Sequence, residues 1–185
     1  MSDMAEGDTH APHTHAPLEA APYTDATRAR LEVAFAAYEL ADLARAAVPI
    51  GEDELSPEGS ARSRCTTLAD AAHVLGAARR FLEAAAVFER VGGADWQLIG
   101  DTLNLSARTA RERFAAAEAR FHDSNAPQGE ASWWRAYLST APLEAARDLD
   151  EWVLRHQDGD GDPGTAPVSG GLVRQAPAPG PAAGG

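Results

Sequence analysis

The residues of this chain best suited to recognition chemistry are the polar and charged side chains between positions 106 and 113. Four of them, Arg108, Thr109, Arg111 and Glu112, recur at spacings that place them on one side of a helix. An arginine can donate two hydrogen bonds to guanine, and a glutamate can accept one from cytosine N4. We therefore expect these four side chains to face base edges of double-stranded DNA.

Three neighbouring residues complete the expected site. Arg113 lies nearer the apolar edge of the same helix and suits a phosphate contact, as does Gln97 at the start of the preceding helix. The Ser106 hydroxyl can accept a hydrogen bond from the free N–H groups that begin the helix. The candidate DNA-binding residues are Gln97, Ser106, Arg108, Thr109, Arg111, Glu112 and Arg113.

Two short amphipathic helices must position these residues. The pattern predicts helices over 96–103, capped by Asp95, and over 107–121, capped by Ser106, which together form a helix-turn-helix at 95–121. Such a pair lays its second helix in the major groove of DNA. The expected local core is Ile99, Leu103, Leu105, Ala110 and Phe114.

The turn between the two helices imposes two local requirements. Asn104 tolerates the left-handed conformation that a helix C-terminus favours. Gly100 costs about 1 kcal/mol against alanine inside a helix, so its presence indicates that the second helix crosses close by.

A resemblance supports this interpretation. The run Trp96-x-x-Ile99-Gly100-x-x-Leu103-x-Leu105-Ser106-x-x-x-Ala110 resembles the helix-turn-helix of sigma-factor fourth regions and related bacterial regulators. The wider stretch FERVGGADWQLIGDTLNLSARTARERF is similar to small helix-turn-helix proteins of actinomycetes. The resemblance implies DNA binding and transcription control. Asn104 stands where that pattern has glycine, and Ala107 stands where it has a polar residue, which removes one expected DNA contact.

The rest of the chain predicts an all-α bundle of about six helices. The other four are expected over 26–47, over 68–90 after a Thr66 or Thr67 cap, over 131–138, and after a Thr140 cap with Pro142 in the first turn. The second of them carries an apolar stripe, which predicts that this helix is central and largely buried. The stripe consists of Leu68, Ala72, Leu75, Leu82 and Ala86.

The two ends of the chain have a composition typical of disorder. Residues 1–23 are rich in alanine, proline and histidine, and residues 157–185 in glycine, proline and alanine. We therefore expect a folded helical domain over 24–156 between two disordered tails.

Composition excludes several functions. The chain has no lysine, so it has neither a phosphate-loop lysine nor a Schiff-base lysine. No catalytic motif is present, and neither the histidines of HAPHTHAP nor the DGDGDPG stretch completes a metal-ligand set. We expect no enzyme activity, catalytic residue, cofactor or metal.

The single cysteine, Cys65, excludes an internal disulfide, and no apolar run approaches the length of a membrane span. We therefore expect a soluble, cytoplasmic protein without a membrane partner. A formal net charge of −12 predicts that non-specific DNA binding is weak and falls with salt.

Two hypotheses from different classes remain open. In the first, the chain is a transcriptional regulator that reads DNA with the helix at 107–121, and a homodimer supplies the affinity that one acidic copy lacks. The helices at 68–90 and 96–103 then support the reading helix, and the helices at 26–47, at 131–138 and after Thr140 complete the core or provide the dimer surface. In the second, the same fold is a protein-interaction module whose partner is RNA polymerase, a sigma factor or a toxin.

Overall fold

A computed structural model describes residues 24–123, 133–157 and 161–173. Within these ranges the fold is all-helical, as predicted, and contains seven α-helices and no strand. The predicted N-terminal tail, 1–23, lies outside the described residues. The helices are α1 Asp25–Ala46, α2 Thr66–Val91, α3 Trp96–Leu103, α4 Ala107–His122, α5 Trp133–Thr140, α6 Pro142–Arg155 and α7 Ser169–Val173.

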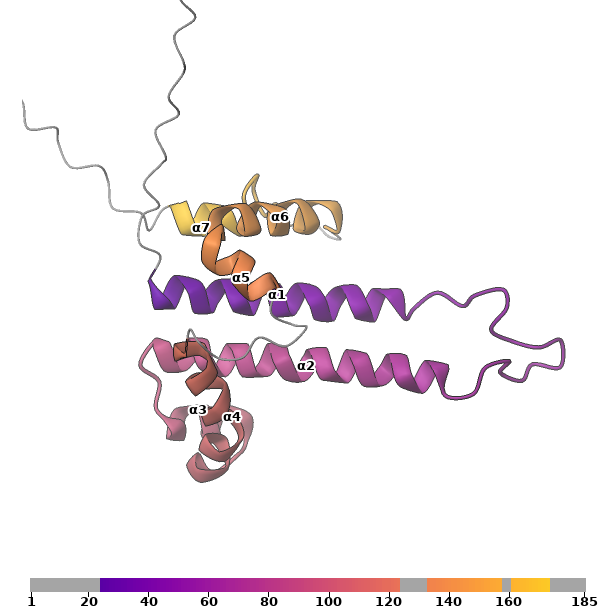
Figure 1. Cartoon of the computed structure of the whole chain (residues 1–185), viewed down its shortest axis with the longest axis horizontal. Helices are drawn as coiled ribbons and strands as arrows, with labels where there is room; N and C mark the ends of the chain where they lie inside the picture. The colour runs from indigo at the N-terminus through magenta and orange to yellow at the C-terminus, as the bar shows by residue number, and fades with distance from the viewer. Residues whose placement is uncertain (1–23, 124–132, 158–160, 174–185) are drawn as a thin grey trace, which may run out of the picture.

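The centre of the fold is an antiparallel hairpin of the two longest helices, α1 and α2 (Figure 1). Small buried residues line both helices, including Ala36 in α1 and Ala77 in α2. An ion pair between Arg80 and Glu39, at 2.9 Å, also joins them. Small side chains let the two helix axes approach closely.

The shorter helices pack on opposite sides of the hairpin (Figure 1). Helices α5, α6 and α7 cover α1 around a cluster that includes Leu31, Leu138 and Leu149. Helices α3 and α4 pack against the C-terminal turns of α2. The last turn of α4 also reaches α1, where Arg28 donates a hydrogen bond to the Phe121 carbonyl at 3.1 Å.

Tryptophan side chains belong to the packing of α1 against α5 and α6. Trp134 stacks on Phe35 with ring centroids 4.6 Å apart, and Trp152 meets Tyr38 edge-on at 5.4 Å. Offset-stacked and edge-to-face pairs of this kind add to the stability that burial of the rings already provides.

The helical fold extends beyond residue 156, where the sequence predicts the C-terminal end of the folded domain. Helix α7 lies within the segment expected to be a tail, and its Leu172 is buried against α6. The buried carboxylate of Asp150 accepts hydrogen bonds from the Val168 N–H, at 2.6 Å, and from the backbone and hydroxyl of Ser169. These long-range hydrogen bonds stabilise α7, whose own sequence does not favour a helix.

Two predicted helix caps are wrong, and so is the burial predicted for α2. Helix α2 begins after Cys65, which is left-handed at φ 66° and makes no capping bond, so neither Thr66 nor Thr67 is the cap. Thr140 ends α5 and bonds back to the Ala136 carbonyl, so it does not cap α6. The first turns of α2 are exposed, because α3 and α4 cover only the last ones.

Candidate nucleic-acid interface

Helices α3 and α4, with the turn that joins them, form the α3–α4 unit. Its two helix N-caps and its turn lie at the residues that the sequence predicts. Asp95 caps α3 by accepting the Leu98 N–H at 2.8 Å, and Ser106 caps α4 by accepting the Thr109 N–H at 3.1 Å. Between them, Asn104 has the expected left-handed conformation, with φ 56°. Both predicted caps and the predicted turn conformation are therefore confirmed.

Gly100 marks the closest approach between the two helices. A Cβ atom at this position would lie 2.7 Å from the Leu105 carbonyl oxygen and 3.2 Å from the Ala107 nitrogen. Both are backbone atoms, which cannot move aside as a flexible side chain could. The close crossing expected from this glycine is thus present, and it fixes where α4 starts relative to α3.

The inner face of α4 is apolar and buried. Ala110, Phe114, Ala117 and Phe121 recur every three or four residues and all lie in the core. Phe114 shares a cluster with Ile99, as expected, and Leu103 packs at its edge. Leu105 is only half-buried and is not a member of this cluster.

Arg90, near the end of α2, makes contacts that orient the α3–α4 unit. The sequence analysis did not predict this role. Its guanidinium donates to the Glu118 carboxylate at 3.0 Å and to the Ala94 carbonyl at 2.6 Å. It also lies over the Trp96 ring, 4.6 Å from the centroid. One half-buried cation therefore contacts α3, α4 and the turn before α3, so both short helices are oriented by the hairpin.

The outer face of α4 carries the predicted arginines. Arg108, Arg111 and Arg113 are exposed, as are Thr109 and Glu112. The Arg108 side chain is 87% exposed and donates to Glu112 at 2.8 Å, one turn further along.

Three of the predicted residues contact neighbouring side chains within the first two turns of α4 and its cap. The Thr109 hydroxyl lies 2.8 Å from the Ser106 hydroxyl, and the Arg113 guanidinium lies 5.3 Å from the centre of the Phe114 ring. The structure thus brings six of the seven predicted residues together on the first two turns of α4 and its cap.

Gln97 stands apart from the other predicted residues. It is exposed on α3, where its amide donates to the Asp101 carboxylate at 2.7 Å. This bond holds the amide along its own helix. A contact from Gln97 to a phosphate would bring the ligand near the Asp101 charge, so Gln97 is the weakest member of the candidate set.

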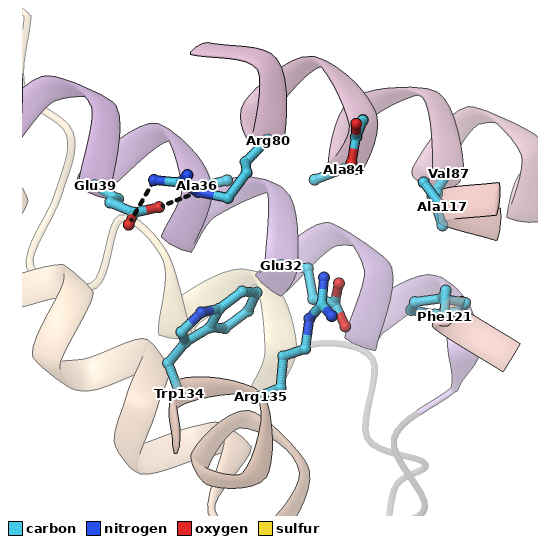
Figure 2. Close-up of a pocket in the computed structure, with 11 residues that line it drawn as sticks. Glu32, Ala36, Glu39, Arg80, Ala84, Val87, Ala117, Phe121, Trp134 and Arg135 are labelled. Atoms are coloured by element: carbon cyan, nitrogen blue, oxygen red, sulfur yellow. Dashed lines mark hydrogen bonds and ion pairs between the residues drawn. The ribbon is translucent and has the colours of Figure 1, made fainter. Parts of the chain in front are cut away.

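The described residues also form hollows away from the outer face of α4. Figure 2 shows one between the hairpin, α4 and α5, with the Glu32 carboxylate next to the Arg135 guanidinium. Its volume of about 40 Å³ holds no more than a few water molecules. Burial raises the pKa of the Glu32 carboxyl, and the charges of Arg135 and Arg28 offset this rise only in part.

Two larger grooves lie elsewhere, one of about 320 Å³ between α1, α5 and α6 and one of about 390 Å³ between α2 and α3. Across ranges 24–123, 133–157 and 161–173, no three histidine, cysteine or carboxylate side chains gather as a metal site would require. None of the helices described is long and apolar enough to cross a membrane.

Comparison with known proteins gives no counterpart for this chain: no family model, no curated protein and no solved structure matches it. The α3–α4 unit is therefore the feature of this chain that bears most directly on its function.

Proposed function

We propose that this protein binds double-stranded DNA by placing α4 in the major groove, and that it regulates transcription. The observation that carries the proposal is the exposed arginine-bearing face of α4, on a helix whose opposite face is buried. Arg108, Arg111 and Arg113 lie in its first two turns, where the positive end of the helix dipole also attracts phosphate.

The dimensions of α4 suit this role. Its 16 residues span about 24 Å, and a helix with its side chains fits the major groove, which is about 12 Å wide. Gly100 and Arg90 hold α4 at a fixed angle to α3 and α2, so the arginines are presented from a rigid support. Rigid presentation lowers the entropy lost when the side chains bind.

Arg108 and Glu112 form the part of the site that reads bases. In the free protein they are paired with each other at 2.8 Å, and both side chains are mostly exposed. An exposed pair of this kind contributes under about 1 kcal/mol, so it opens easily when DNA binds. Arg108 then donates to guanine, and Glu112 accepts from a neighbouring cytosine.

The overall charge of −12 limits what one copy can achieve. The acidic body repels the DNA backbone, so non-specific affinity is low and falls as salt rises. Two copies on adjacent half-sites would add their contacts, which is how helix-turn-helix proteins commonly gain affinity.

The test is fluorescence anisotropy of the full chain with a pool of labelled random duplexes at several salt concentrations. The variant is Arg108→Ala with Arg111→Ala. The control is Arg45→Ala with Arg147→Ala, which removes the same charge from exposed positions on α1 and α6. We expect salt-sensitive binding that the variant loses and the control keeps. A drop of about one in the salt slope is expected for each phosphate contact removed.

The opposite result would reject the proposal. If the protein does not bind duplexes at micromolar concentration, or if variant and control bind equally, α4 does not read DNA. The protein-interaction hypothesis would then take precedence, with the same exposed face offered to a protein of the transcription machinery.

A further inference from the structure

Helix α2 exposes leucines that its own fold does not use. Leu68 is 69% exposed and Leu75 is 52% exposed, although leucine is among the residues most often buried. Ala77, which is 0% exposed, faces the interior of the hairpin. At about 100° per residue, Leu68 and Leu75 lie half a turn away from Ala77, on the side that faces away from α1. Figure 1 shows no other helix along this side of the first turns of α2.

These leucines belong to a strict seven-residue repeat. Leu68, Leu75 and Leu82 are seven residues apart, and Ala71, Ala78 and Ala85 follow each of them by three positions. Apolar residues at alternating spacings of three and four are the pattern by which helices pair over several turns. We call these six residues the α2 seam.

The last part of the α2 seam already forms half of a groove. Leu82 and Ala85 line the hollow of about 390 Å³ between α2 and α3, together with Leu98 of α3. Leu98 is itself 58% exposed. The seam therefore offers protruding leucines at its start and an apolar recess at its end.

We propose that the α2 seam joins two copies of this chain in antiparallel orientation. When the second copy is reversed, Leu68 meets Ala85 of the other copy, Ala71 meets Leu82, and Leu75 meets Ala78. Every layer then places one large side chain against one small one, which fills space at the density that protein interiors require. The protruding leucines of each copy enter the recess of the other, so the contact is self-complementary.

Charge at the two ends of the seam favours the same register. Arg64, two residues before α2 begins, and Glu89, near its end, are both exposed, so the antiparallel arrangement brings the positive charge of one copy near the negative charge of the other. The arrangement places opposite charges together at both ends of the interface. A parallel pair would instead stack leucine on leucine and alanine on alanine, leaving gaps at the alanine layers.

The interface does not depend on DNA binding, but it has a consequence for the proposed function. Each copy carries its α3–α4 unit at the C-terminal end of α2, and the 26 residues of α2 span about 39 Å. An antiparallel pair therefore places the two units at opposite ends, at a separation similar to one turn of DNA, about 34 Å.

The first test measures the mass of the full chain by sedimentation between 1 and 100 µM. We expect a reversible dimer, and we expect Leu75→Glu to weaken the dimer at least tenfold while circular dichroism stays unchanged. The control is Leu154→Glu, at a leucine of α6 that is 43% exposed and outside the seam. A wild-type monomer at 100 µM, or a dimer unaffected by Leu75→Glu, would overturn the proposal.

The second test fixes the orientation by disulfide trapping in a Cys65→Ser background. Leu68→Cys and Ala85→Cys are made separately, in proteins that are then mixed under mild oxidation. The antiparallel seam brings these two cysteines within bonding distance, so we expect the mixed dimer to form a disulfide and neither single variant to do so. Disulfides within a single variant would show parallel pairing, because antiparallel copies hold identical positions about 25 Å apart.

DNA binding and dimerisation can fail separately. The DNA-binding test uses Arg108 and Arg111 on α4, and the two dimer tests use α2 without DNA. A dimer that does not bind DNA would reject the proposed function and leave the seam in place.

Discussion

Replacing Gly100 with alanine should destabilise this protein, although the same change stabilises most helices. Alanine is better than glycine inside a helix by about 1 kcal/mol. Here, however, the new methyl group would lie 2.7 Å from the Leu105 carbonyl oxygen and 3.1 Å from the Ser106 carbonyl carbon. An ordinary contact begins about 3.4 Å away, so the turn must move by roughly half an ångström or more.

The size of the effect follows from these opposed contributions. Forcing an extra methyl group into packed surroundings costs about 1–3 kcal/mol, and the gain in helix propensity offsets part of this cost. We expect a net loss of about 1–2 kcal/mol in the free energy of unfolding, or roughly 3–6 °C in melting temperature for a domain of this size. DNA affinity should fall as well, because the start of α4 moves relative to α3.

Gly76 provides a matched control for this prediction. It lies in the middle of α2, and a methyl group there would meet only the flexible Arg80 side chain, at 3.5 Å. Gly76→Ala should therefore raise the free energy of unfolding by up to about 1 kcal/mol. Urea unfolding of both variants measures the two effects with one assay. If Gly100→Ala proves as stable as the wild type, the close crossing of α3 and α4 is not what requires glycine.

Three further predictions concern single carboxylates. Glu32→Gln should raise the melting temperature at pH 7 and lose its advantage at pH 4 and below. Burial raises the pKa of Glu32 above its ordinary value of 4.5. The wild-type protein therefore loses stability as the pH rises through that raised pKa, and the glutamine variant does not. An equal gain in melting temperature at both pH values would contradict this prediction. Glu112→Ala should strengthen non-specific duplex binding about fivefold at low salt, because it removes a negative charge beside the arginines. If anisotropy titrations show no change in affinity, α4 is not the DNA-facing helix. Asp150→Ala should release α7 from α6, because Ser169 loses its buried acceptor. Hydrogen exchange over 161–173 would then accelerate, and Glu151→Ala, at an exposed neighbour, should leave it unchanged.

The sequence predicts the α3–α4 unit well because its signals are local. Asp95 and Ser106 each bond to a backbone N–H three residues ahead, and asparagine is a residue type that tolerates the left-handed conformation found at position 104. Such features can be read from short stretches of sequence without knowing the rest of the fold. The contacts of Arg90 could not be predicted in this way, because they join three segments whose relative positions only the folded chain defines.

The features that the sequence predicts wrongly are those that depend on contacts between distant parts of the chain. Helix α7 contains Ser-Gly-Gly, which disfavours helix, and it is held by Asp150, nineteen positions before Ser169. The stripe on α2 correctly indicates an apolar surface, but a sequence pattern does not say how much of that surface the rest of the chain covers. Leu82 is partly covered by α3 and α4, whereas Leu68 and Leu75 remain exposed within the chain.

The placement of the shorter helices on opposite sides of the hairpin has a consequence for folding. The cluster around Trp134 and the cluster around Phe114 share no residue, so each side buries its own apolar surface. We expect the two sides to open as separate cooperative units in native-state hydrogen exchange. Substitutions around α5–α7 should then leave the orientation of α4 against the end of α2 unchanged.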